Sequence, residues 1–128
     1  MAETWEGHCK AHLGQHKCLN NLCITGKEGN TYGTSSPDFQ VPPELIQKLR
    51  SVLANGSDTS FDFLNEKYII IRHDDSCLIS KCGKKSILFY CTDTMCLVGQ
   101  TVDDETNKCN AGNIAMANIS DFYKKKGL

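Results

Sequence analysis

The chain has 128 residues, with 14 Lys and Arg against 15 Asp and Glu, and its formal net charge at pH 7 is −1. This length fits one domain, and a composition of 40% hydrophobic and 23% charged residues excludes a disordered chain. The near-neutral charge argues against nucleic acid as a partner, and no apolar run approaches the roughly 20 residues of a transmembrane segment. The acidic, polar start does not resemble a secretory signal, so we expect a cytoplasmic protein.

Eight cysteines are the most unusual feature of this composition. In a reducing compartment their thiols would stay free. Three pairs share the spacing C-x4-C, but no pair has the two-residue gap of a zinc ribbon or redox motif. Because most of them fall in apolar or β-like runs, we predict that they are mainly small buried hydrophobic residues. They are Cys9, Cys18, Cys23, Cys77, Cys82, Cys91, Cys96 and Cys109, paired by spacing as 18/23, 77/82 and 91/96.

The N-terminal third predicts a short helix followed by a β-hairpin. Thr4 is a candidate N-cap, and Gly14 is expected to end the helix. Between them Trp5, Cys9 and Leu13 recur every four residues, as on one side of a helix. Residues 19–25 and 31–34 are typical of two strands, and the polar residues 27–30 between them predict a turn.

A second helix is predicted from Pro42-Pro43 to Asn55-Gly56, with proline tolerated in its first turn and glycine as its cap. Short strands then follow over residues 61–64, 67–72, 77–80, 87–91 and 95–99, and we expect residues 68–71 to form a buried run. A final helix is predicted over residues 109–126. Its apolar stripe is expected to consist of Ile114, Ala115, Ala117, Ile119 and Phe122.

This order of elements predicts an α+β fold. Tight turns between the later strands require antiparallel pairing. A single antiparallel sheet of six to seven strands, with helices packed on its faces, would bury every apolar stripe. We find no repeat, no linker and no second domain, so residues 1–128 are expected to form one domain.

Catalytic motifs are absent from the sequence. It has no phosphate-binding loop and no G-x-S-x-G turn. We therefore expect no enzyme activity, no catalytic residue and no cofactor. The segment from His8 to Cys18 is the strongest metal candidate, since His8 and His12 would lie one helical turn apart. It lacks further ligands at a standard spacing, so we expect no metal site there.

Residues along the whole chain resemble the profilin family. A profilin begins with a short Trp-bearing helix, followed by an apolar strand and a Gly-x-x-Gly hairpin, and it ends in a helix with an Asp-Tyr-Leu…Gly-Leu pattern. Matching segments here are Thr4-Trp5-Glu6-Gly7-His8, Ile24 to Tyr32, Phe39, Pro43-Glu44-Leu45, Leu64 to Arg72, Asn113 and Asp121 to Leu128. The resemblance implies the profilin fold, with the N- and C-terminal helices on one face of the sheet and the shorter helix on the other.

The resemblance further implies a site for proline-rich ligands in the polyproline II conformation. Such ligands have exposed carbonyls and flat rings, on which aromatic side chains pack while their N–H and O–H groups donate to the carbonyls. The residues that would line this groove are Trp5, His8, Tyr32, Phe122 and Leu128. His8 and Tyr32 replace more usual aromatic residues and Phe122 has no hydroxyl, so weaker binding is expected, and His8 would make it pH-sensitive.

It also implies a non-enzymatic protein that binds monomeric actin, regulates its polymerisation and associates with the cytoskeleton. Basic side chains around an apolar patch suit an acidic partner. The positions that match the family's actin-binding surface are Lys67, Ile70, Arg72, Lys81, Ser86, Lys108, Asn113, Ala117 and Asn118. Phosphoinositide headgroups are a further implied partner, through the lysine clusters 81/84/85 and 124/125/126.

Two alternatives remain open at the level of sequence. One is a small cysteine- and histidine-based metal-binding or redox protein. The other is a helix-and-sheet signalling module that does not bind actin.

Overall fold

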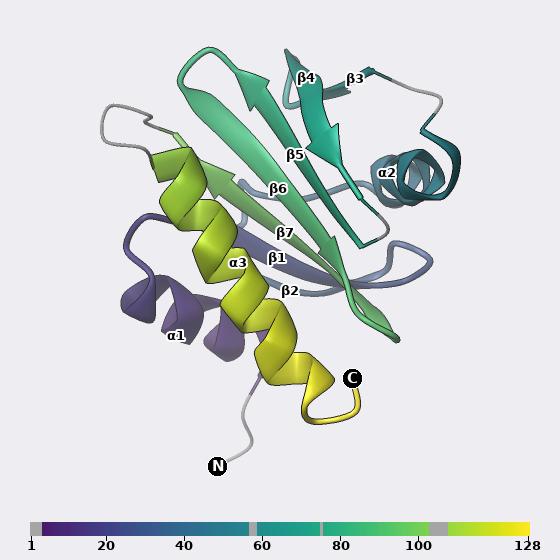
Figure 1. The fold of residues 1–128 in the computed structure, drawn as a ribbon. Coiled ribbons are helices and arrows are strands. Elements are labelled where there is room, and N and C mark those ends of the chain that lie inside the picture. Colours follow the sequence, from purple (N-terminus) through teal and green to yellow (C-terminus); the bar gives the residue numbers. More distant parts are fainter. Residues whose placement is uncertain (1–3, 57–58, 75, 103–107) are drawn as a thin grey trace.

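The computed structural model describes residues 4–56, 59–74, 76–102 and 108–128, and of residues 108–110 only the backbone. The helices within these ranges are α1 (Trp5–Gln15), α2 (Pro43–Asn55) and α3 (Lys108–Lys124). The strands are β1 (Asn21–Gly26), β2 (Thr31–Thr34), β3 (Ser60–Phe63), β4 (Glu66–His73), β5 (Cys77–Cys82), β6 (Lys85–Cys91) and β7 (Met95–Thr101) (Figure 1).

All seven strands form one sheet in the order β2-β1-β7-β6-β5-β4-β3. Each neighbouring pair is antiparallel. Strands β3 to β7 form a meander, and β1 joins it beside β7. The predicted antiparallel sheet of six to seven strands is therefore confirmed.

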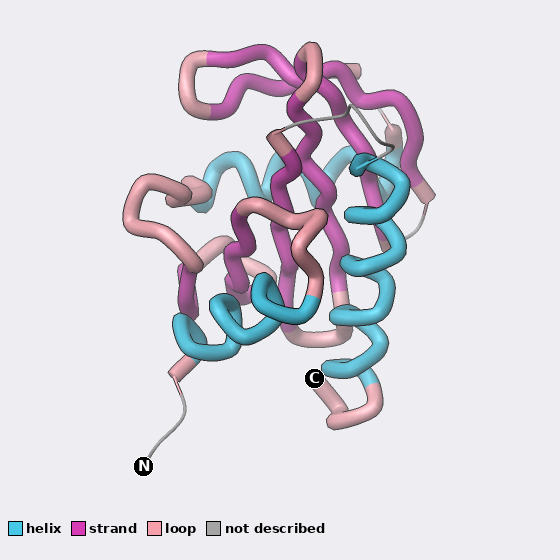
Figure 2. Tube along the Cα trace, turned by 90° about the vertical axis from the view of Figure 1, so that its left-hand side faces the viewer, coloured by secondary structure: helices cyan, strands magenta, loops and turns pink. Residues whose placement is uncertain are grey.

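Helices cover both faces of this sheet. α3 crosses the sheet over β6 and β7, and α1 packs against β1 and β2 beside it (Figures 1 and 2). α2 packs on the opposite face. Because side chains of a strand alternate between faces, the sheet divides the buried residues into two cores. One core contains Leu45, Ile46 and Leu49 of α2, and the other contains Ala115, Met116 and Ile119 of α3.

Two predicted helix ends are confirmed and one is wrong. The Thr4 hydroxyl accepts a hydrogen bond from the backbone N–H of Gly7 at 2.9 Å, as an N-cap does. Gly56 ends α2 in the left-handed conformation, with a φ of 64°. Gly14, however, lies inside α1, which continues to Gln15. A glycine costs a helix too little to end it when the turn remains hydrogen-bonded.

The predicted buried run in β4 is also wrong. Tyr68 is fully buried, but Ile69 and Ile71 are 49% and 57% exposed, because β4 lies near the edge of the sheet and α3 does not cover it. The strand contains a β-bulge as well. Ile70 and Arg72 oppose the consecutive residues Ser80 and Ile79, which leaves Ile71 as an extra residue.

The inner side of α3 differs from the predicted stripe. Ala115 and Ile119 are buried as expected, but Ile114 and Phe122 are 63% and 43% exposed. The helix instead turns Gly112, Ala115, Met116, Ile119 and Tyr123 toward the sheet. Gly99 in β7 and Gly112 explain this rotation, since they let the helix and the sheet approach closely. An added Cβ on Gly99 would lie 2.6 Å from the Met116 sulfur.

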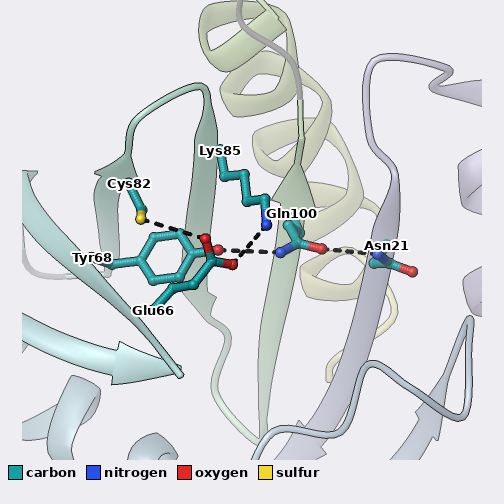
Figure 3. A network of polar contacts seen from close by, with 6 residues as sticks. All are labelled: Asn21, Glu66, Tyr68, Cys82, Lys85 and Gln100. Carbon is teal, nitrogen blue, oxygen red and sulfur yellow. Dashed lines mark hydrogen bonds and ion pairs between the residues drawn. The ribbon is translucent and has the colours of Figure 1, made fainter. Parts of the chain in front are cut away.

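Polar contacts connect distant strands on the α2 face (Figure 3). The side-chain amide of Gln100 in β7 donates to the Tyr68 hydroxyl in β4 at 3.3 Å and accepts from Asn21 Nδ2 at 2.9 Å. Since β5 and β6 separate β7 from β4, this contact requires the sheet to curl toward α2. Beside it, Lys85 Nζ and Glu66 Oε1 form an ion pair of 2.7 Å.

The cysteines in the described part of the chain carry free thiols. Cys9, Cys23, Cys77, Cys91 and Cys96 are buried, and Cys18 and Cys82 are half-buried. This confirms the interpretation of most cysteines as small core residues, while the Cys109 side chain lies outside the described residues. No helix within the described ranges is both long and apolar enough to cross a bilayer.

Candidate functional site

An aromatic cluster centred on Trp5 forms where α1, β2 and α3 meet. The Trp5 ring centroid lies 5.5 Å from that of His8, 5.6 Å from Tyr32 and 5.8 Å from Tyr123. Trp5 and His8 are half-buried, and Tyr32 is 41% exposed. Three elements thus bring their rings together, and those of α1 and β2 are accessible at the surface.

The close approach of α1 to β2 at Gly33 positions Trp5 in this cluster. A Cβ on Gly33 would lie 2.6 Å from the Trp5 carbonyl carbon and 2.8 Å from the Trp5 Cβ. Any larger residue would push α1 away from the hairpin. Tyr32 immediately precedes Gly33 in the sequence. Glycine at position 33 therefore allows Trp5 to lie directly beside Tyr32.

A buried hydrogen bond supports the cluster from below. Nε2 of His12 and the hydroxyl of Tyr123 lie 2.8 Å apart, and both residues are buried. Burial lowers the pKa of His12 from its usual 6.5, and the imidazoles of His8 and His16 lower it further. Burial also raises the pKa of Tyr123 to about 12. Both groups are therefore neutral near pH 7, as a buried hydrogen-bonded pair requires.

Phe122 contributes to this surface from the other side of Tyr123. Its ring lies 5.1 Å from Tyr123 and 5.7 Å from His12, and the Lys126 ammonium lies 4.9 Å from its centroid. A groove of about 280 Å³ runs between the helices beside it. This groove is lined by His8, Ala11, His12, Gln15, His16, Asn118, Ile119 and Phe122.

The five residues expected to line the proline-rich groove come from three separate parts of the chain, and three of them lie close to one another. The Trp5 ring contacts those of His8 and Tyr32. Leu128 packs against the core under α1 and α3, and its N–H donates to the Tyr123 carbonyl at 3.0 Å. Phe122 reaches them through Tyr123 and His12.

Sequence reasoning missed Tyr123, which contacts Trp5 directly and is only 1% exposed. The spacing of α3 contained the necessary information. Ala115, Ile119 and Tyr123 recur every four residues, whereas Phe122 lies one position away from that stripe.

A second surface lies on the α3 face of the sheet, beyond the edge of α3. Directly opposed strand residues share a face, so Ile69 lies with Lys81 and Arg72 lies with Ile79, which belongs to the core under α3. Lys67 is two residues from Ile69 and shares its face. Positive side chains thus flank the exposed Ile69 on this face.

The N-terminal half of α3 adjoins this surface through a polar contact. The Tyr90 hydroxyl of β6 donates to the side-chain oxygen of Asn113. Ala117 is half-buried and Asn118 is exposed. The expected actin-facing residues Lys67, Arg72, Lys81, Asn113, Ala117 and Asn118 therefore come from one side of the sheet and the helix that covers it.

Two other expected residues, Ile70 and Ser86, do not join this surface, and a third cannot be placed. Ile70 packs against the core on the α2 face. Ser86 is fully buried and hydrogen-bonded to the Thr101 hydroxyl, so a partner cannot reach it directly. The Lys108 side chain lies outside the described residues. The sequence did not predict that Ile69 is exposed. Residues 68–71 are all apolar, so their composition does not distinguish a strand with one exposed side from a strand buried on both sides.

No group of three or more His, Cys, Asp and Glu side chains is placed to hold a metal ion within the described residues. In the segment from His8 to Cys18, His12 bonds Tyr123 and Cys9 is buried in the core. Burial raises the pKa of Cys9 to about 12, so its thiol stays protonated. The structure gives no support to the metal-binding alternative.

Comparison with known proteins identifies the family. The Profilin family model matches residues 3–128. Profilin-1A of Acanthamoeba castellanii is 25% identical over 128 residues, which covers 98% of this chain and 99% of that protein. The structure of Acanthamoeba castellanii profilin IB superposes with a TM-score of 0.86 at 22% identity, covering 98% of this chain and all of that one. LokiProfilin2, in a complex with rabbit actin, has a TM-score of 0.73 at 18% identity, with 98% and 96% coverage. The chain therefore belongs to the profilin family.

Proposed function

We propose that this profilin binds monomeric actin and regulates its polymerisation. The observation that carries this proposal is the match of the family model over nearly the whole chain. Complexes of LokiProfilin1 and LokiProfilin2 with rabbit actin support it, since these proteins share the fold and bind actin despite low sequence identity.

The α3 face of the sheet is the surface that we assign to actin. Lys67, Arg72 and Lys81 supply positive charge around the exposed Ile69, and Asn118 extends the surface onto α3. Charge of this kind speeds the encounter with an acidic partner, and apolar area holds the complex. Binding acts by differential affinity for one conformation of actin, so no covalent step is needed.

A charge reversal on each face tests this assignment. Arg72→Glu changes the α3 face, and the matched control Lys48→Glu changes an exposed residue of α2 on the other face. In pyrene-actin assembly, wild type and Lys48→Glu are expected to lower the assembly rate alike. Arg72→Glu is expected to raise the dissociation constant about tenfold. If wild type leaves the kinetics unchanged, actin binding is rejected; if both variants behave alike, only the assigned surface is rejected.

We further propose that the aromatic cluster binds proline-rich ligands in the polyproline II conformation. Exposed rings of Tyr32 and Phe122 flank the half-buried Trp5. The Tyr32 hydroxyl and the Trp5 indole N–H are hydrogen-bond donors suited to the ligand carbonyls. Leu128 adds apolar surface at the end of the chain.

The fluorescence of Trp5 reports on this site, because it is the only tryptophan. Titration with a polyproline peptide is expected to shift the emission and to saturate. Tyr32→Ala should weaken binding by ~1–3 kcal/mol, as the loss of a central aromatic contact does. Ile71→Ala removes a still more exposed apolar side chain from β4 and should leave binding unchanged. A folded wild type without affinity for the peptide would reject the site.

The lysine clusters are our candidates for phosphoinositide headgroups. Lys85 already pairs with Glu66, which lowers the free positive charge of the cluster at residues 81, 84 and 85. The cluster at residues 124–126 is exposed, so it is the stronger candidate. Co-sedimentation with vesicles that contain phosphoinositides should be reduced by Lys124→Gln/Lys125→Gln and not by Lys84→Gln.

A further inference from the structure

Cys91 and Cys96 face each other at the end of the β6–β7 hairpin. They are directly opposed in the register of the two strands, and their Sγ atoms lie 3.6 Å apart. The other C-x4-C spacings do not produce such a pair. Cys77 and Cys82, for example, lie at the two ends of β5.

The backbone at this position suits a covalent link between the two side chains. The N–H of Cys91 donates to the carbonyl of Ser76, away from β7, and the next pair, Thr92 and Met95, carries the ladder bond of the hairpin. Cys91 and Cys96 are therefore a non-hydrogen-bonded pair, whose Cα atoms lie about 4.5 Å apart. This separation lies within the range that a disulfide spans, so rotation of the side chains can bring the sulfurs to about 2.05 Å.

A small basic pocket leads to one of the two thiols. It has a volume of about 160 Å³ and is lined by Lys27, Arg50, Leu53, Ala54 and Cys91. Arg50 Nη1 donates to the Lys27 carbonyl at 2.6 Å, which fixes the two basic walls relative to each other. Cys91 is 9% exposed and Cys96 is fully buried. A small molecule that enters the pocket thus meets Cys91 first.

The surroundings of Cys91 favour its thiolate. Cys96, acting as hydrogen-bond donor, holds the pKa of Cys91 below its usual range against the opposing effect of burial, and the charges of Lys27 and Arg50 lower it further. The same contact and burial raise the pKa of Cys96. The pair therefore consists of a nucleophilic sulfur at the pocket and a protonated partner behind it.

We propose that Cys91 and Cys96 form a modification site that hydroperoxides oxidise to an intramolecular disulfide. The Cys91 thiolate attacks the terminal oxygen of the hydroperoxide, the O–O bond breaks, and an alkoxide or hydroxide leaves and takes a proton from solvent. Cys91 is thereby oxidised by two electrons to the sulfenic acid. The Cys96 sulfur then attacks the Cys91 sulfur, the S–O bond breaks, and the oxygen leaves as water with the Cys96 proton.

Cys77 is an internal control for this oxidation. It is 8% exposed, close to Cys91, but its thiol donates to Asp74 Oδ2 at 3.2 Å. Burial and this carboxylate raise the pKa of Cys77. With similar exposure and the opposite charge beside it, Cys77 should resist the oxidation that Cys91 undergoes.

Peptide mass spectrometry tests the proposal on the folded chain. Trypsin releases Cys91 and Cys96 in one peptide, residues 86–108, because no Lys or Arg lies between residues 86 and 107. After treatment with hydrogen peroxide and alkylation, this peptide is expected to be two hydrogens lighter and to carry no alkyl group. Addition of a reductant should restore two alkylation sites. The disulfide should form in Cys77→Ser and be absent from Cys91→Ser and Cys96→Ser.

Two further measurements keep the proposal open to rejection if a core variant fails to fold. Arg50→Gln changes an exposed side chain at the pocket and should slow disulfide formation several-fold, whereas Lys48→Gln, on the same helix, should not. In folded Cys96→Ser, a sulfenic-acid reagent should label Cys91. The proposal is overturned if peroxide-treated wild type takes up two alkyl groups in this peptide, or if Cys91 is oxidised while Cys96 stays free.

Discussion

The hydroxyl of Tyr123 lies 2.8 Å from Nε2 of His12, and this hydrogen bond joins the last helix of the chain to the first. The two helices carry all rings of the aromatic cluster except Tyr32 of β2, so their attachment decides whether Trp5, Tyr32 and Phe122 form one surface. The groups that face His12 are the imidazoles of His8 on α1 and of His16 just after it, and the rings of Phe122 and Tyr123 on α3.

Acidification is expected to destabilise the protein through His12. Its pKa in the folded state lies below the usual 6.5, so the unfolded chain binds more protons as the pH falls through that value. The free energy of unfolding should therefore decrease from pH 7 downward. Urea unfolding over a pH series measures this decrease. His12→Gln should flatten the profile, while His73→Gln, an exposed residue outside this cluster, should keep the wild-type slope.

Two glycine substitutions should have opposite effects on stability. Gly33→Ala places a Cβ against the Trp5 backbone, so it should cost about 1–3 kcal/mol and displace α1. Gly14→Ala adds a methyl group inside α1 with no atom within 4 Å, so it should stabilise by ~0.5–1 kcal/mol. Thermal unfolding compares them. Equal stabilities for the two variants would contradict the close packing of α1 on β2.

The neighbouring isoleucines of β4 should separate binding from stability. Ile69→Ala removes a half-exposed side chain, so it should weaken the proposed actin complex and change the free energy of unfolding by less than about 0.5 kcal/mol. Ile70→Ala truncates a residue packed on the α2-side core and should cost ~1–3 kcal/mol of stability without weakening actin binding. Urea unfolding and actin titration of both variants measure the two effects. A reversed pattern would place the binding surface on the other face.

A hydroxyl on Phe122 should strengthen the proposed proline-rich site. The Phe122 ring is 43% exposed, so Phe122→Tyr can present a donor to a ligand carbonyl at a gain of about 0.5–1.5 kcal/mol. Titration of Trp5 fluorescence with a polyproline peptide measures the gain. Phe63→Tyr is not a suitable control because Phe63 is buried. Tyr32→Phe is the matched control, since it removes a hydroxyl from the same surface and should weaken binding.

Local signals predicted the elements of this fold well. The Thr4 cap, the Gly56 cap and the turn between β1 and β2 depend on residues adjacent in sequence, and each appeared where it was expected. The errors concern contacts between distant segments. Ile69 and Ile71 have the composition of a core strand, and only the position of α3 over β6 and β7 leaves them exposed.

The candidate site was predicted only in part, again because some of its contacts join segments that are distant in sequence. Trp5, His8 and Tyr32 were expected together, and the Trp5 ring contacts the other two. The residue of α3 that contacts Trp5 is Tyr123 and not the expected Phe122, and this difference depends on the rotation of α3. The four-residue spacing of Ala115, Ile119 and Tyr123 is compatible with that rotation. The close approach at Gly99 and Gly112, however, involves contacts between the helix and distant segments of the chain. The juxtaposition of Cys91 and Cys96 likewise depends on the register of β6 and β7. Three cysteine pairs share the same spacing, so the spacing alone could not indicate which pair lies face to face.

The β-bulge in β4 makes strand register a determinant of surface charge. Tyr68 and Ile70 point to the α2 side, so a regular strand would carry Arg72 to that side as well. The extra residue Ile71 returns Arg72 to the side of Ile79. Deletion of Ile71 alone would therefore restore regular pairing and keep the arginine opposite Ile79. If Ile71 instead took a regular place in the ladder, the composition would be unchanged and Arg72 would turn to the α2 side. The pairing of β4 with β5, and not its composition, thus determines on which face of the sheet this charge lies.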